Sequence, residues 1–112
     1  MNLHTLKDKD NRTFVLTSER WNHIIERHPE MEEHLLDLET VLMEPDIICR
    51  STHVHNTILY YKKFGKLSLK RVNFSDVYIT VIVDISKNLI KTAYPAREII
   101  KGEKIWQKIA AD

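Results

Sequence analysis

Hydrophobic and polar positions follow a helical period in the first part of the chain. A short apolar run at residues 13–16 predicts a strand, which follows a polar turn at residues 8–12. Thr17 or Ser18 then supplies a helix cap, and a first helix is predicted from about residue 19 to 27. That helix ends near His28, because the following proline disfavours helical geometry there.

A second helix is predicted between two prolines. Pro29 suits the first position of a helix, and the pattern ends before Pro45. The apolar positions between them recur at helical spacing, at Met31, Leu35, Leu38 and Leu42.

After Pro45 the pattern changes to that of strands. Strands are predicted at residues 47–49, 57–61, 67–72, 77–83 and 89–94. The run at 77–83 is rich in β-branched residues and continuous enough to be central. Gly65 is predicted to interrupt the chain, Pro95 to stop the last strand, and residues 98–109 to form a short closing helix.

This order predicts an α+β fold. Its N-terminal helices pack on one face of a mostly antiparallel sheet of four to five strands, and a short C-terminal helix completes it. The length of 112 residues suits a single domain over residues 1–112, with a core at about 13–106. The second face of the sheet is expected to be available for a ligand.

Composition excludes several classes of protein. The longest apolar runs are only a few residues, and the N-terminus has no apolar signal core, so we expect a cytoplasmic protein without a membrane span. The single Cys49 lies in an apolar run and is interpreted as a packing residue. With only Gly65 and Gly102, the chain has no glycine-rich phosphate loop.

Charge is divided unevenly along the chain. Residues 1–48 carry 5 Lys/Arg and 11 Asp/Glu, whereas residues 49–112 carry 12 and 5, so a net −6 precedes a net +7. A basic second half made of strands fits a face that binds nucleic acid, although solvated outer faces give the same pattern.

Two clusters hold most of the groups suited to a phosphodiester, at residues 21–30 and 91–97. His28 is the first candidate for proton transfer; its alternative is a ring that caps a backbone carbonyl. His23 lies five residues earlier, about 140° away on an ideal helix, and is expected to support the site. Arg27 shares the side of His23 and either binds substrate or pairs with a neighbouring glutamate.

The second cluster offers hydrogen-bond donors at the end of a strand. Thr92 and Tyr94 share a strand face and suit the binding of a phosphoryl oxygen, although strand propensity alone also explains them. Arg97 suits bidentate contact with a phosphate, with a surface charge as the alternative.

Further candidates lie on the middle strands. Lys62 and Arg71 suit phosphate binding, with a solvated strand face as the alternative, and Tyr61 faces the side opposite to Lys62. His53 and His55 have the spacing of some metal sites, but no acidic third ligand is evident, so no metal is expected.

The tetrapeptide Arg27-His28-Pro29-Glu30, the run Tyr60-Tyr61-Lys62 and the strand end Thr92-Ala93-Tyr94 carry a resemblance to a known group. With them the chain resembles the barnase/EndoU/colicin/RelE superfamily of small ribonucleases. It is most similar to the phage and polymorphic-toxin branches and less so to BrnT toxins. The chain departs from barnase in having no convincing catalytic glutamate on its central strands.

The resemblance implies a toxin-like, metal-independent endoribonuclease in which the 2′-hydroxyl attacks the adjacent phosphate. The expected partners are RNA (mRNA or tRNA) and a cognate antitoxin or immunity protein, with no cofactor. The catalytic candidates are His28, Thr92, Tyr94 and Lys62, and the substrate-binding candidates are Arg97, Tyr61, Arg71, Arg27 and His23. The alternative is a non-catalytic RNA-binding or protein-interaction module with the same fold.

Overall fold

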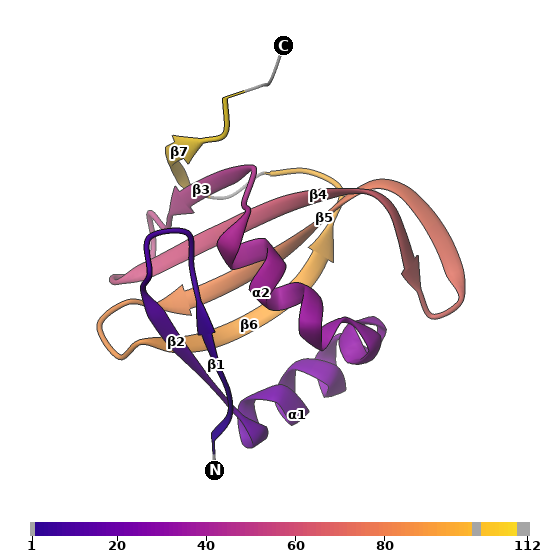
Figure 1. The fold of residues 1–112 in the computed structure, drawn as a ribbon, viewed down its shortest axis with the longest axis horizontal. Helices are drawn as coiled ribbons and strands as arrows, with labels where there is room; N and C mark the ends of the chain where they lie inside the picture. The colour runs from indigo at the N-terminus through magenta and orange to yellow at the C-terminus, as the bar shows by residue number, and fades with distance from the viewer. Residues whose placement is uncertain (1, 100–101, 110–112) are drawn as a thin grey trace.

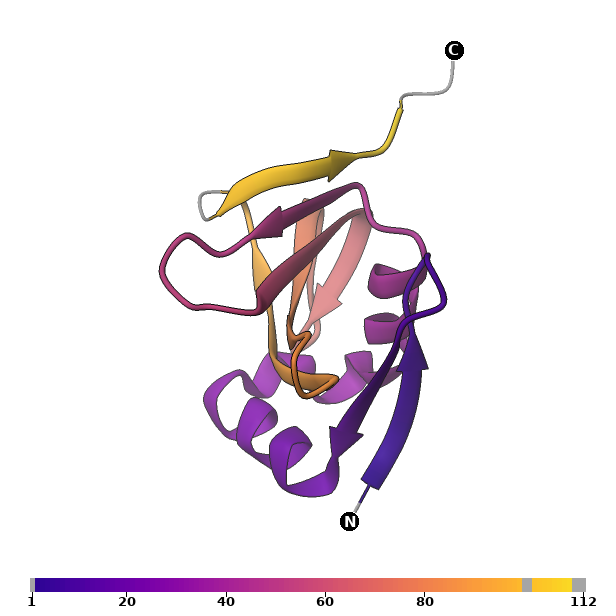
Figure 2. The same cartoon turned by 90° about the vertical axis from the view of Figure 1, so that its left-hand side faces the viewer.

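A single curled sheet dominates the computed structural model, which describes residues 2–99 and 102–109 (Figures 1 and 2). Within these residues the sheet has seven strands: β1 (Asn2–Lys7), β2 (Thr13–Thr17), β3 (Ile47–Arg50), β4 (Thr57–Leu69), β5 (Val72–Asp84), β6 (Leu89–Ala96) and β7 (Glu103–Gln107). Their order is β1-β2-β6-β5-β4-β3-β7. Only β2 and β6 are parallel neighbours, so the sheet is mixed.

The predicted fold class is wrong. Instead of helices on a four- to five-stranded antiparallel sheet, the described residues form seven strands with two α-helices, α1 (Ser18–Arg27) and α2 (Leu35–Met43), and a 3-10 helix, η1 (Pro29–His34). None of these helices is both long and apolar enough to cross a membrane.

The predicted C-terminal helix is also wrong in the part that the structure describes. Residues 100–101 of the predicted range lie outside the described residues, and Glu103–Gln107 is strand β7, paired with β3. The reason is tertiary: the backbone groups on the outer edge of β3 gain hydrogen-bond partners from β7, and Trp106 packs against the core.

Two predicted strand breaks are absent. β4 continues through Gly65, where nothing lies within 4 Å of the place that a Cβ would take. Pro95 lies inside β6, opposite Ile79. Among the described residues β2 pairs with β6 only at Leu89, so this end of β6 is an edge of the sheet, where proline is tolerated.

The local signals around α1 are confirmed. The Thr17 Oγ1 accepts a hydrogen bond from the Arg20 N–H at 3.1 Å and so caps the helix. At the other end His28 leaves helical geometry, with φ −130° and ψ 73°, immediately before Pro29. The predicted second helix is divided, since η1 precedes α2.

The two faces of the sheet differ in how they are covered. α2 and η1 pack against one face over the main core, whose fully buried members include Phe14, Leu16, Ile24, Met31, Leu38, Leu42, Ile79 and Val81 (Figure 1). The second face carries a smaller cluster around Cys49, Leu59 and Tyr61. Burial raises the pKa of the Cys49 thiol, which fits a packing role for this side chain. Much of the second face is therefore also covered, and the open space on it lies in cavities beside β6.

The two residues at the tip of the β4–β5 hairpin are not the types that its turn favours. Lys70 (φ 50°) and Arg71 (φ 69°) occupy the left-handed region in a two-residue turn, where Asn-Gly is preferred. We expect the double change Lys70→Asn and Arg71→Gly to raise the free energy of unfolding by about 1 kcal/mol, as measured by urea denaturation. The double glutamine variant is the control, because it removes the same charges and keeps the strain. Equal stability of the two variants would contradict the expectation.

Candidate functional site

A cavity of about 370 Å³ lies between α1 and β6. β2 pairs with β6 only at Leu89, and α1 packs beside the remainder of β6. The polar side of α1 lies toward the second face of the sheet. Seven side chains line the cavity: Arg20, His23, Arg27, His28, Lys91, Thr92 and Tyr94. The two clusters singled out in the sequence thus meet in one place.

α1 contributes three of these side chains from one face. Arg20, His23 and Arg27 follow one another at spacings of three and four residues, which places them on one side of a helix. His28 lies beyond the helix, and its non-helical φ and ψ replace the ideal helical rotation. Both imidazoles therefore line the same cavity, although ideal helical spacing predicts that they point in different directions.

Both backbone polar groups of His28 make hydrogen bonds. Its N–H donates to the Ile24 carbonyl at 2.7 Å, and its carbonyl accepts from the Met31 N–H at 2.9 Å. The ring is half-buried, with Nδ1 3.5 Å from the Glu30 Oε1 and the Tyr94 ring centroid 5.3 Å away. The backbone of His28 thus caps the helix, and the imidazole faces a carboxylate and a phenol.

A β-bulge explains how β6 supplies neighbouring side chains to the cavity. Ile90 pairs with Val83 and Thr92 with Ile82, so Lys91 is an extra residue in the ladder. Lys91 and Thr92 are adjacent in the chain, and both line the cavity, which regular alternation does not allow. Tyr94, two residues after Thr92, completes this wall.

The charge inside the cavity suits an anion. Three permanent cations line it, at Arg20, Arg27 and Lys91, and no carboxylate is among the described lining residues. Burial raises the pKa of the Tyr94 phenol, so that this group keeps its proton at neutral pH and can donate a hydrogen bond. Together with the Thr92 hydroxyl, the phenol supplies neutral donors beside the cations.

The chain matches no family model, no curated protein and no solved structure. The resemblance to the ribonuclease superfamily therefore rests on its short motifs alone. In the described part of the chain, no three His, Cys, Asp or Glu side chains lie close enough together to hold a metal ion.

Four of the predicted site residues are not among those that line this cavity. Lys62 donates to the Glu44 carbonyl at 3.1 Å and lines a different surface hollow beside Trp106. Arg71 is at the tip of the β4–β5 hairpin and is not among the lining residues. The Arg97 guanidinium lies 5.9 Å from the Phe74 ring centroid. Tyr61 is buried, with its ring edge-on to another tyrosine. None of the four belongs to the site proposed below.

Two lining residues are absent from the candidates that the sequence suggested, Arg20 and Lys91. The signal for Arg20 was present, because it precedes His23 and Arg27 on one helix face. The signal for Lys91 was absent, because a bulge depends on the register between two strands. Cations from both the acidic and the basic part of the chain therefore meet in the cavity.

Tyr61 gives the fold a sensitivity to alkaline pH. Burial, with Tyr94 and Cys49 close by, raises its pKa to about 12, against about 10 in an unfolded chain. The fold thus favours the neutral phenol, so this contribution to stability is complete below pH 10 and declines as pH rises toward 12. Between these two pKa values, the free energy of unfolding is expected to fall by about 1.4 kcal/mol per pH unit for one such tyrosine. Denaturation midpoints between pH 10 and 12 should fall less steeply in Tyr61→Phe than in the original chain, and parallel curves would contradict this.

Proposed function

We propose that this protein is an endoribonuclease that cleaves RNA by attack of a ribose 2′-hydroxyl on the adjacent phosphate, without a metal ion. One observation carries the proposal: two imidazoles, a phenol, a hydroxyl and three cations line a single cavity. These are the groups that proton transfer and phosphate binding require.

Two proton transfers accompany the reaction. His28, oriented by Glu30, takes the proton of the 2′-hydroxyl, whose oxygen forms a new bond to phosphorus. The bond from phosphorus to the 5′-oxygen of the next nucleotide breaks, and His23 gives that oxygen a proton. The products are a 2′,3′-cyclic phosphate and a free 5′-hydroxyl, so no co-reactant is consumed.

Charge develops on the phosphoryl oxygens as the new bond forms. Thr92 and Tyr94 donate hydrogen bonds to these oxygens, and one such donor is typically worth about 3 kcal/mol. Arg20, Arg27 and Lys91 neutralise the phosphate and hold it beside His28. Tyr94 also packs against the His28 ring and restricts its orientation.

The decisive experiment is RNA cleavage in excess EDTA. Purified protein is incubated with total RNA and tRNA, beside a matched RNA whose riboses are 2′-O-methylated. We expect cyclic phosphate ends from the first two substrates and none from the methylated RNA. Cleavage that requires added magnesium would overturn the proposed mechanism. Salt-dependent binding without cleavage would instead support a non-catalytic RNA-binding module.

The resemblance also predicts a cognate antitoxin or immunity protein, and the single cysteine and short apolar runs of the sequence fit a location in the cytoplasm. Such a partner is expected to cover the cationic cavity, because an inhibitor of this site gains most by presenting carboxylates to Arg20, Arg27 and Lys91. The predicted partner rests on the proposed activity.

A further inference from the structure

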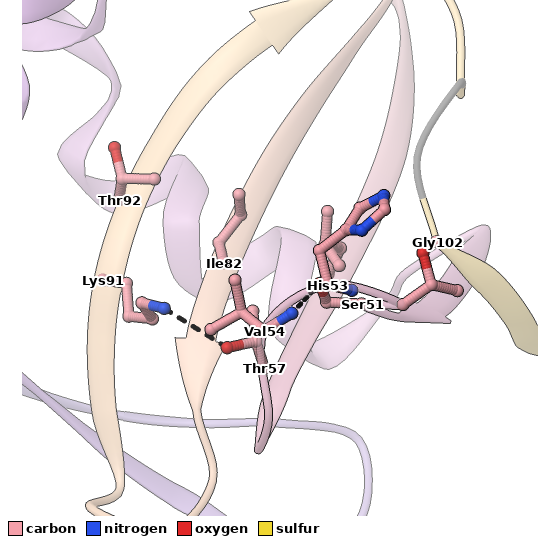
Figure 3. A pocket seen from close by; sticks show the side chains of 10 residues that line it. Ser51, His53, Val54, Thr57, Ile82, Lys91, Thr92 and Gly102 are labelled. Atoms are coloured by element: carbon pink, nitrogen blue, oxygen red, sulfur yellow. Dashed lines mark hydrogen bonds between the residues drawn. The ribbon is translucent and has the colours of Figure 1, made fainter.

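A second and larger cavity, of about 510 Å³, opens on the same face of the sheet (Figure 3). It lies between the loop that joins β3 to β4 and the strands β5 and β6. Its lining residues are Ser51, Thr52, His53, Val54, Thr57, Leu59, Ile82, Lys91, Thr92 and Gly102. Lys91 and Thr92 also line the first cavity, so the two cavities meet at β6.

The strand register connects the cavities by a direct row of side chains. Leu59 of β4 is opposite Ile82 of β5, and Ile82 is opposite Thr92 of β6. Paired residues lie on the same face of a sheet, and the row spans two interstrand spacings, or about 10 Å. A ligand lying along this row would contact Leu59 at one end and the phosphate-binding groups at the other.

The chemistry of the second cavity changes along that row. Leu59, Ile82 and Val54 supply apolar surface, and Ser51, Thr52 and His53 bring polar groups from the loop (Figure 3). A cationic side chain stands where the cavities meet, since the Lys91 Nζ donates to the Thr57 Oγ1 at 3.2 Å. The two cavities together therefore suit a ligand with a flat, mostly apolar part and an anionic part.

The loop that forms the outer wall is already ordered by hydrogen bonds. The Ser51 Oγ accepts from the His53 N–H at 3.2 Å and from the Val54 N–H at 3.1 Å. At the base of the loop the Ser51 N–H donates to the Thr57 carbonyl at 2.9 Å. A wall fixed in this way costs little conformational entropy when a ligand binds.

We propose that this second cavity binds the nucleobase of a nucleotide that adjoins the scissile phosphate, and that His53 contributes to its recognition. This inference rests on the proposed ribonuclease function. A base supplies the flat apolar part, and its own phosphate reaches Lys91 and Thr92. Free phosphate would occupy only the cationic end, and an apolar peptide would leave Lys91 without an anion.

Binding is measured by NMR with dinucleotides that cannot be cleaved, because the ribose beside the phosphate is 2′-O-methylated. Each of the four bases is tested on either side of the phosphate, with inorganic phosphate as the reference probe. We expect the methyl signals of Leu59 and Val54 to shift with a dinucleotide in a base-dependent manner. Phosphate alone should shift only the Thr92 methyl signal.

A pair of loop variants tests the role of His53. His53 lines the cavity, whereas His55 lies in the same exposed loop and is not among its lining residues. We expect His53→Ala to weaken binding of the preferred dinucleotide about tenfold, the loss of one modest contact, and His55→Ala to leave it within twofold. Equal effects of the two changes would overturn the role of His53.

The inference and the proposed function fail in different ways. If dinucleotides shift the methyl signal of Thr92 but not those of Leu59 and Val54, the base site is overturned. The cleavage assay then decides the proposed function separately. If both cavities respond but no RNA is cut, the catalytic function is overturned and the base site stands. If no signal responds to any dinucleotide, the base site is overturned.

Discussion

Replacement of His28 by alanine is expected to lower the rate of RNA cleavage by about 10²- to 10⁴-fold, the usual contribution of a general acid or base. The effect should appear in kcat, because in the proposed mechanism the imidazole moves a proton while the cations bind the phosphate. Single-turnover cleavage of a short RNA in EDTA measures it. Arg27→Ala should instead act mainly by raising KM.

The fold should survive the change at His28. Its backbone N–H and carbonyl make the hydrogen bonds that end α1, and alanine keeps both groups. Circular dichroism and the thermal midpoint therefore serve as controls for folding. His55→Ala is the matched control for loss of an imidazole, with activity within twofold of the original chain. A His28→Ala variant that is folded and nearly as active would contradict the assignment of His28 as the catalytic base.

Replacement of Asp8 by alanine is expected to cost about 3 kcal/mol of unfolding free energy or more. Asp8 is 2% exposed, and its carboxylate accepts from three donors. These donors are the Asp10 N–H at 2.9 Å, the Arg12 N–H at 2.8 Å and the Tyr60 hydroxyl at 2.6 Å. Alanine leaves the buried Tyr60 hydroxyl and two partly buried backbone N–H groups without this acceptor, and each buried unsatisfied donor costs about 1–3 kcal/mol. Urea denaturation followed by circular dichroism measures the loss.

A double-mutant cycle isolates the interaction that joins the β1–β2 turn to β4. Tyr60→Phe removes one donor and keeps the ring that packs edge-on against Phe14. If the carboxylate and the phenol interact as described, the double variant loses less stability than the sum of the two single variants. Additive losses, or an Asp8→Ala cost below about 1 kcal/mol, would show that Asp8 is not the link between turn and sheet.

The sequence predicted the features that depend on neighbouring residues. The start of α1 at Thr17 and its end before Pro29 follow from a capping hydroxyl and a proline, which act within one turn. The candidate cluster at residues 21–30 was found by the residue types in one short segment, although ideal helical spacing places His23 and His28 apart. The cluster at residues 91–97 could also be found by residue type. That it lies opposite α1 across one cavity could not be predicted.

The parts that sequence reasoning missed depend on contacts between distant segments. β7 is a strand because it pairs with β3, more than 50 residues away, as the ion pair between Arg50 and Glu103 illustrates. The sequence alone predicts that Asp8 is an exposed turn residue. In the structure Asp8 is buried, and the Tyr60 hydroxyl donates to its carboxylate. Strand alternation counted forward from Ile90 places Thr92 in the core, and only the pairing with β5 shows that it faces the cavity.

The bulge at Lys91 has an evolutionary consequence. Ile90 and Thr92 pair with consecutive residues of β5, so a chain without residue 91 would form a regular ladder with Ile90 still in the core and Thr92 still at the cavity. A single-codon insertion at this point therefore introduces a cation and a bend together, and leaves the side chains on either side facing as before. Such an insertion adds the third cation of the proposed site to an existing sheet in one genetic step, without redesign of the core.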